Sequence, residues 1–173
     1  MGAASAALWS FGGELARLRL GWTSSGLGAL WIAVGAAGIA GAFAGSLTRR
    51  FGIDAVHRAS LLALAAGVIL AGTALATPPT VLGGGALFGA AYVMLSGTYL
   101  VWGVSALPDR PASGLTIGFL TVAAGQALRA PLFGLLLDRA GADAAALTFA
   151  ALALAACAAQ SRPRSRPLPS TFR

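Results

Sequence analysis

Five long apolar runs constrain the fold of this chain more than any other feature of its sequence. A helix needs roughly 17 to 25 mostly apolar residues to cross a bilayer, and inside lipid it must satisfy its own backbone polar groups. With 57% hydrophobic and only 10% charged residues, the chain has too little polar surface to cover a water-soluble globule. We therefore expect an all-α, polytopic membrane helical bundle with about five complete transmembrane helices, at residues 25–47, 59–76, 81–106, 114–137 and 144–160.

Short polar segments separate these runs, and we expect turns at 48–58, 77–80, 107–113 and 138–143. The single histidine, His57, falls in the first of these turns, and we interpret it as a solvated loop residue. The bundle should cover residues 21–160. Residues 1–20 should hold the remnant of a preceding helix and an outer loop, because only 13 residues precede the first charged side chain. The Pro- and Arg-rich residues 161–173 predict a disordered cytoplasmic tail.

The arginines predict how the bundle is oriented. The chain has a formal charge of +7, and its basic residues lie between or beyond the apolar runs instead of along one face. We therefore expect no nucleic-acid partner. The side of the bundle with more arginine should be cytoplasmic, which predicts a multi-pass protein of the inner (plasma) membrane with a cytoplasmic C-terminus. That side would carry Arg49, Arg50, Arg58, Arg110, Arg162, Arg164, Arg166 and Arg173, against Arg17, Arg19 and Arg139 on the other.

Two octapeptides repeat one pattern. GSLTRRFG and GLLLDRAG both read Gly-x-Leu-x-x-Arg-x-Gly; they begin at residues 45 and 134, an offset of 89 residues, and each ends an apolar run. An odd number of crossings separates the two runs, so the copies should end on opposite faces of the membrane. Copies that run in opposite directions form an inverted-topology repeat, which is typical of secondary transporters. A chance match among Ala-, Gly- and Leu-rich helices is the alternative.

Three stretches also resemble the C-terminal half of a major facilitator superfamily transporter: LRLGWTSSGLGALWIAVGAAGIAGAFAGSLTRRFG, LFGAAYVMLSGTYLVWGVSALPDRPASG and GQALRAPLFGLLLDRAG. The resemblance implies that the five runs correspond to helices eight to twelve of that fold. It also implies a fragment that lacks an N-terminal transporter half or an oligomer partner. In the family, a cytoplasmic loop of this pattern helps to gate the transporter. The sequence departs at Arg49, where the family usually has aspartate; the matching gating residues are Gly45, Leu47, Arg50 and Gly52.

Polar side chains within the third and fourth runs are candidates for a substrate cavity, because such groups usually face a bundle interior or water. They are Tyr92, Ser96, Tyr99, Gln126 and Arg129. A charge near a helix centre costs roughly 2.5 to 3.5 kcal/mol, so Arg129 needs compensation. It could attract an anionic or carbonyl-bearing substrate, or it could bond helix carbonyls, reach the interface or pair with a carboxylate of an absent partner. Helix–helix hydrogen bonds are the alternative role for the tyrosines and the serine.

The function best supported by these patterns is secondary active transport of a small solute by alternating access, in a permease or efflux protein present here as a truncated half. The alternative is a small non-transporting membrane scaffold or accessory subunit. We expect no enzyme activity and no cofactor, because the chain has no lysine for a phosphate-binding loop and no nucleophile elbow. One Cys and one His give no metal site. We expect the lipid bilayer and a small molecule as partners.

Overall fold

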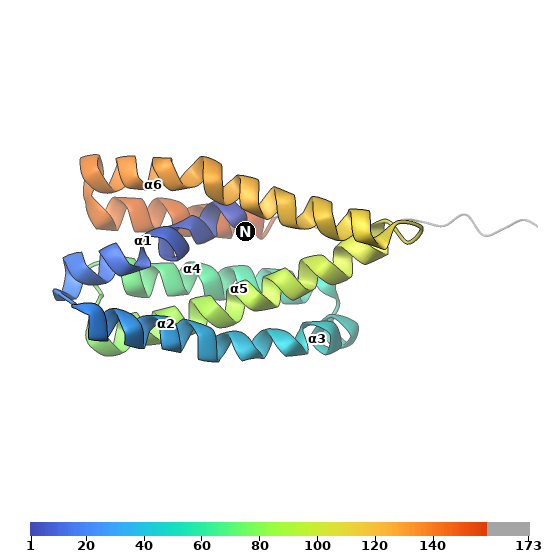
Figure 1. Ribbon diagram of the computed structural model, residues 1–173, viewed down its shortest axis with the longest axis horizontal. Helices are drawn as coiled ribbons and strands as arrows, with labels where there is room; N and C mark the ends of the chain where they lie inside the picture. Colours follow the sequence, from blue (N-terminus) through green and yellow to red (C-terminus); the bar gives the residue numbers. More distant parts are fainter. Residues whose placement is uncertain (159–173) are drawn as a thin grey trace, which may run out of the picture.

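The computed structural model describes residues 1–158, and every regular element in that part of the chain is helical (Figure 1). The elements are α1 (Gly2–Leu20), α2 (Ser24–Gly38), the 3-10 helix η1 (Ile39–Phe43), α3 (Ala44–Phe51), α4 (Ile53–Gly72), α5 (Pro78–Ala106) and α6 (Pro111–Ala156). The expected all-helical fold is confirmed for these residues. The predicted tail at 161–173 lies outside the described residues.

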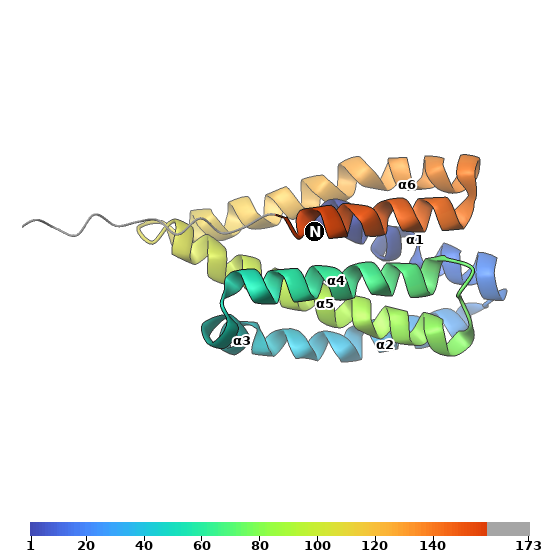
Figure 2. The same ribbon diagram turned by 180° about the vertical axis from the view of Figure 1, so that it is seen from behind.

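Four helical segments are long and apolar enough to cross a membrane: Ser24–Phe51, Ile53–Gly72, Pro78–Ala106 and Pro111–Ala156. The sequence predicted five spans, and the difference lies in α6, whose 46 residues hold the fourth and fifth predicted spans. Non-helical torsion angles at Gly141 turn α6 back on itself. It therefore consists of a first arm, residues 111–140, and a second arm, residues 142–156, which lie side by side (Figures 1 and 2).

Single glycines make the two tightest connections. Gly52 (φ 84°, ψ 154°) joins α3 to α4, and Gly141 (φ 83°, ψ 172°) joins the arms of α6. Only glycine readily adopts this combination of positive φ and extended ψ. An added Cβ would meet no atom within 4 Å at either position, so the backbone conformation, and not lack of space, requires glycine there. The turns expected at 48–58 and 138–143 were therefore too long, since nearly all of those residues are helical.

Helix α5 begins within the segment 77–80 that the sequence assigned to a turn. Thr77 caps the helix: its Oγ1 accepts the backbone N–H of Thr80, while the Thr80 Oγ1 accepts the backbone N–H of Thr77 at 2.7 Å. Pro78 fits the first helical position, where no intrahelical N–H bond is needed. This capping box satisfies two N–H groups that would otherwise lack partners, which explains why the helix starts here.

Helix α1 has 19 residues, about 28 Å of helix, and remains helical through the charged stretch that sequence analysis assigned to an outer loop. Gly21 ends it in a left-handed conformation, and its N–H donates to the carbonyl of Arg17 at 2.8 Å. The first two turns of α1 are almost completely buried against α6 because their side chains are small. The buried residues there are Gly2, Ala4, Ser5, Ala6, Ala7 and Leu8.

The helices pack in two layers. In Figure 1, α1, α2 and the first arm of α6 lie nearer the viewer, and in Figure 2 α4 and the second arm of α6 do, while α5 crosses obliquely from one layer to the other. The core between them is filled by aromatic and branched side chains with almost no exposure. Phe133 of the first arm packs between Phe11 and Phe149, with ring centroids 4.8 and 4.9 Å away. The other large buried side chains include Leu15, Leu30, Leu61, Leu64, Val68, Val81, Phe88 and Leu95.

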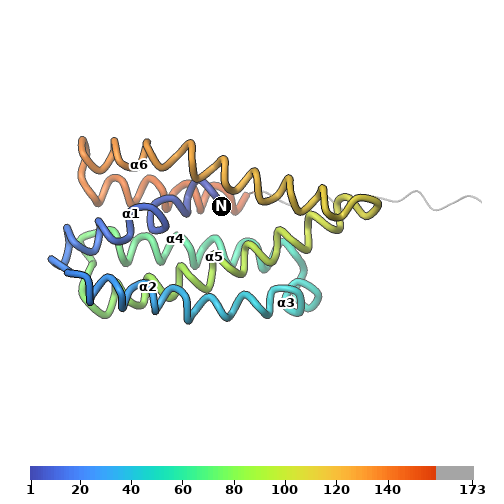
Figure 3. The backbone as a smooth tube through the Cα atoms, viewed as in Figure 1, coloured from blue at the N-terminus to red at the C-terminus, as the bar shows by residue number. Residues whose placement is uncertain are grey.

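The bundle contains two three-helix units related by the offset of 89 residues. The first unit is α1, α2 with η1 and α3, and α4; the second is α5 and the two arms of α6. Each helix of the first unit runs opposite to its counterpart in the second when the tube is followed from blue to red (Figure 3). The turn after α3 and the turn between the arms of α6 consequently lie at opposite ends of the molecule. The antiparallel relation that the sequence repeat predicted is present in the fold.

Candidate functional site

Two of the predicted cavity residues come together in a hydrogen-bonded cluster. The Gln126 amide lies 3.0 Å from Ser5 Oγ and 3.3 Å from the Tyr92 hydroxyl, so the cluster joins α6, α1 and α5. Ser5 is fully buried and also donates to the carbonyl of Gly2. Such bonds hold membrane helices together, which corresponds to the alternative that sequence analysis left open for these side chains.

Aromatic rings extend this cluster towards the surface. The ring of Tyr92 stacks on Trp9 with centroids 5.1 Å apart and an interplanar angle of 8°, and it also stacks on Phe88. Trp9 is 48% exposed and meets Trp31 edge to face. Sequence analysis missed both Ser5 and Trp9. Their partners lie on other helices far along the chain, and no spacing within α1 identifies them.

Ser96 and Tyr99 lie on the face of α5 towards the first arm of α6. Ser96 donates its hydroxyl proton to the carbonyl of Tyr92 one turn earlier, at 2.9 Å. Both residues line a narrow cleft of about 30 Å³ with Tyr92 and residues of α6. The Tyr99 hydroxyl bonds instead to a residue of α4, Nε2 of His57, at 3.1 Å.

His57 is not a solvated loop residue, which corrects the interpretation from sequence. It lies in the second turn of α4 with 3% of its surface exposed. Its ring contacts Tyr99 and meets Trp102 edge to face at 6.2 Å between centroids. The turn at Gly52 occupies one residue, so α4 starts early enough to carry His57 into the bundle. The apolar or small residues Val56, Ser60, Leu61 and Leu64 share this buried face at helical spacing, a signal that the sequence contained.

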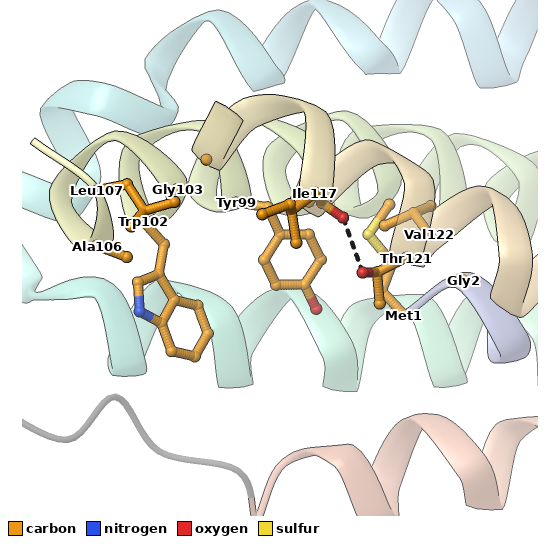
Figure 4. Close-up of a pocket in the computed structure, with 12 residues that line it drawn as sticks. Met1, Gly2, Tyr99, Trp102, Gly103, Ala106, Leu107, Ile117, Thr121 and Val122 are labelled. Atoms are coloured by element: carbon orange, nitrogen blue, oxygen red, sulfur yellow. Dashed lines mark hydrogen bonds between the residues drawn. The ribbon is translucent and has the colours of Figure 1, made fainter. Parts of the chain in front are cut away.

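A cavity of about 330 Å³ opens beside Tyr99 and Trp102, between α5, the first arm of α6 and the start of α1 (Figure 4). Glycines form much of its wall: Gly103, Gly114 and Gly118. A Cβ at Gly103 would lie 2.8 Å from the carbonyl oxygen of Gly114, so α5 and α6 meet closely there because both residues lack side chains. The cavity is mainly apolar. The Tyr99 hydroxyl and the Thr121 hydroxyl supply polar side-chain groups, and Thr121 donates to the carbonyl of Ile117.

Arg129 does not join the other predicted cavity residues. It is exposed on the first arm of α6, next to Leu128, which is 76% exposed. No hydrogen bond or ion pair within residues 1–158 engages its guanidinium. Any compensation of its charge therefore comes from a group outside the described residues.

The predicted gating residues lie in α3 and in the turn that follows it. Gly45 and Leu47 are half-buried on α3, Arg50 is exposed, and Gly52 is the one-residue turn. The Arg50 guanidinium lies over the ring of Phe51, 5.2 Å from its centroid.

The opposite end of the bundle is closed by a polar contact that sequence analysis missed, here named the Arg19–Asp143 clasp. Arg19 Nη2 lies 2.6 Å from Asp143 Oδ2, and the Arg19 guanidinium donates twice to the carbonyl of Gly72. The other Asp143 oxygen accepts the backbone N–H of Ala74 at 2.7 Å. The clasp therefore ties the end of α1 and the end of α4 to the second arm of α6.

Asp143 follows Gly141 by two residues, as Asp54 follows Gly52, so the repeated pattern extends from Gly-x-Leu-x-x-Arg-x-Gly to include x-Asp-Ala. Sequence analysis treated both carboxylates only as loop residues. The extended repeat is a signal that could have identified Asp143 as part of a structured helix joint. Its partner, Arg19, lies 124 residues away, and one sequence cannot reveal that contact.

Within residues 1–158, no three side chains of His, Cys, Asp or Glu lie close enough together to hold a metal ion. Comparison of the chain with protein-family models, with curated proteins and with solved structures found no match.

Proposed function

We propose that this chain is a multi-pass membrane protein and one bundle of a secondary active transporter, of the major facilitator kind, that moves a small solute by alternating access. The observation that carries the proposal is the pair of three-helix units running in opposite directions, with a clasp at one end and a cavity towards the other. Inverted units of this kind allow a bundle to adopt two conformations in which the units exchange roles. Any up-and-down bundle of six helices has this antiparallel relation, so the proposal depends on the repeat itself: both units carry Gly-x-Leu-x-x-Arg-x-Gly, whose last glycine forms a one-residue joint, at the same offset.

The cavity supports a solute that is small and mainly apolar. Its volume of about 330 Å³ falls at the lower end of the range for small-molecule sites. Trp102 and Tyr99 offer aromatic faces, and the glycines leave flat backbone against which a ring or chain can pack. A few hydroxyl groups would fix the orientation of the solute. This lining agrees with a permease or efflux protein for an uncharged or amphipathic compound.

Membrane insertion is supported by the four helical segments of sufficient length and apolarity. By the positive-inside bias, the end of the bundle that carries Arg49, Arg50 and Arg58 faces the cytoplasm of a bacterial-type inner membrane. The Arg19–Asp143 clasp then lies at the outer end. The conformation described is one in which the outer end is held by polar contacts.

The exposed Arg129 favours a second bundle beside this one. A guanidinium on a lipid-facing surface is costly, and a carboxylate or a wet cavity on a partner would remove that cost. In a transporter the partner is the other half of the permease or another copy of this chain. The same observation supports the second candidate function, a non-transporting scaffold or accessory subunit whose exposed face binds other helices.

Electron–electron distance measurements separate the two functions without any knowledge of the solute. Nitroxide labels are placed in a Cys157→Ala background in nanodiscs, at Ser25 with Ala140 for the clasp end and at Phe51 with Asp109 for the cavity end; all four positions are exposed. A transporter should give two distance populations at each end. Asp143→Asn removes the ion pair of the clasp, so it should enlarge the population with the longer distance at the clasp end and the population with the shorter distance at the cavity end. One unchanging population at both ends, with and without Asp143→Asn, would contradict alternating access and leave the scaffold.

A further inference from the structure

We propose that His57, through its hydrogen bond with Tyr99, couples proton binding to the state of the cavity, so that the coupling ion is a proton. This inference rests on the proposed transport function and adds the group that takes up the proton. The carboxylates of the chain lie near the ends of helices or in turns: Glu14, Asp54, Asp109, Asp138 and Asp143. The structure adds a buried imidazole, the type of side chain whose unperturbed charge change falls between about pH 5 and 8, in contact with a cavity wall residue.

The position of His57 suits this role. It lies one turn inside the N-terminal end of α4, with 3% of its surface exposed, so water at the bundle end is near while the ring itself is enclosed. Its Nε2 is 3.1 Å from the Tyr99 hydroxyl. Tyr99 and Trp102 both line the cavity, and both rings contact the imidazole. A change of charge on His57 is therefore transmitted to the cavity through direct contacts.

Proton uptake reverses the direction of the hydrogen bond. When the imidazole is neutral with its lone pair on Nε2, the Tyr99 hydroxyl donates its hydrogen to that nitrogen. A proton taken from water binds Nε2 and forms an imidazolium, whose N–H then donates to the Tyr99 oxygen. The Tyr99 hydrogen is released from this bond and can turn to a solute. No other bond forms or breaks, and one proton leaves the water for each imidazolium formed.

This reversal also restricts the solute. The protonated site offers a hydroxyl donor to the cavity, so it favours a compound that carries a hydrogen-bond acceptor such as a carbonyl or ether oxygen on an otherwise apolar frame. When His57 is neutral, the Tyr99 hydroxyl donates its hydrogen to His57, so the cavity no longer favours a solute with a hydrogen-bond acceptor. Solute binding and proton binding then favour each other, which is the thermodynamic requirement for coupling.

Several charged or titratable groups surround the imidazole, and some of them favour its protonated form while others disfavour it. Asp54 and Arg58 lie on α4 itself, Tyr99 faces the ring from α5, and the α-amino group of Met1 acts from the start of α1. Directly after the end of α6, the thiol of Cys157 lies against the backbone carbonyl of Arg58 at 3.9 Å. Helix α3 carries Arg49 and Arg50, which are exposed. Burial of the ring is the largest influence and disfavours the imidazolium, as do the neighbouring cations, whereas Asp54 favours it. Movement of α4 relative to α1 would therefore change the affinity for the proton.

Because the chain has a single histidine, nitrogen-15 histidine labelling gives the two ring-nitrogen signals of one imidazole, which need no assignment by mutation. The same two label pairs are then measured from about pH 8 down to about pH 4.5, a range that extends well below the ordinary imidazole pKa of about 6.5 because burial disfavours the imidazolium. We expect the imidazole signal to titrate and the ratio of the two conformations to change. The change should be about tenfold for each unit by which the pKa differs between conformations. His57→Gln should abolish the pH response.

Two further variants keep the test decisive. Tyr99→Phe retains the imidazole and removes the hydroxyl, so its signal should still titrate while the population ratio loses its pH dependence. Ser60→Ala, a buried position one turn along the same helix, is the matched control and should behave like the unsubstituted protein. If His57→Gln does not yield folded protein, the Tyr99→Phe result alone decides.

The outcomes distinguish the two proposals. A pH response that persists in His57→Gln or in Tyr99→Phe overturns the role of this pair. Two conformations that respond to Asp143→Asn but not to pH also overturn proton coupling through His57, while transport stands. A single conformation in every variant and at every pH overturns the transport function, and with it this inference.

Discussion

Individual residues set the connections between helices more strongly than loop composition suggested. Gly52 and Gly141 occupy the same rare backbone region, are 89 residues apart, and each replaces a predicted loop by one residue. The repeated Gly in both octapeptides was visible in the sequence. The structural role of this glycine could not be predicted, because a glycine that ends an apolar run is equally consistent with the start of a longer turn.

Gly141→Ala should destabilise the protein by about 1 to 3 kcal/mol, since a residue with a Cβ is strained at this combination of φ and ψ. Open space around the position excludes a steric clash as the cause. Gly28→Ala is the matched control: Gly28 is helical, also has nothing within 4 Å, and should become neutral or slightly more stable with alanine. Reversible unfolding in mixed micelles measures both changes. Equal changes in the free energy of unfolding for the two substitutions would contradict the backbone strain expected for alanine at position 141.

His57 shows where residue-level prediction from the sequence failed. The arginines around it suggested water, but its burial follows from the helical spacing of Val56, Ser60, Leu61 and Leu64 on one face of α4. The sequence contained that helical spacing, but the prediction for His57 gave more weight to the charged residues beside it. The bond to Tyr99 spans 42 residues and the bond from Gln126 to Ser5 spans 121, and neither can be derived from one sequence.

At the scale of elements, the predicted apolar runs correspond to the helices, but their ends differ. A run ends where apolar residues stop, whereas a helix ends where its last N–H or C=O groups find partners. The capping box of Thr77 and Thr80 starts α5 before its apolar run begins. Helix α1 continues past Glu14 and Arg19 and ends only at Gly21, whose left-handed conformation caps it. Charged residues at a helix end can remain helical because they reach water or a neighbour, as Arg19 does in the clasp.

The contact between the two arms of α6 depends on the aromatic cluster around Phe133. Phe133→Ala should lower the free energy of unfolding by about 3 to 5 kcal/mol, because Phe133 is fully buried between Phe11 and Phe149 and its removal leaves a cavity. Phe119→Ala makes the same chemical change on the same arm at a side chain that is 54% exposed. It should cost less than about 1 kcal/mol. Comparable losses in mixed-micelle unfolding would mean that this cluster does not hold the arms.

For the whole molecule, the opposite directions of the two units make a prediction about sidedness. In a Cys157→Ala background, Arg50→Cys should react with a membrane-impermeant maleimide from the cytoplasmic side, and Ala140→Cys from the outer side. Both positions are exposed; one adjoins the turn after α3 and the other the turn between the arms of α6, and these turns lie at opposite ends of the molecule (Figure 3). Right-side-out and inverted vesicles provide the comparison. Reaction of both cysteines from one side would contradict the membrane arrangement and remove the main support for alternating access.

The one-residue joint within α6 also governs how this protein can enter a membrane. The ribosome delivers α6 as a single stretch of 46 residues, in which only the short polar segment 138–143 separates two apolar spans. Its tip carries Asp138, Arg139 and Asp143, which must reach the far side before either arm rests in lipid. We expect the translocon to receive both arms as one helical hairpin. The glycine at position 141 would then be needed for insertion into the membrane as well as for the final fold.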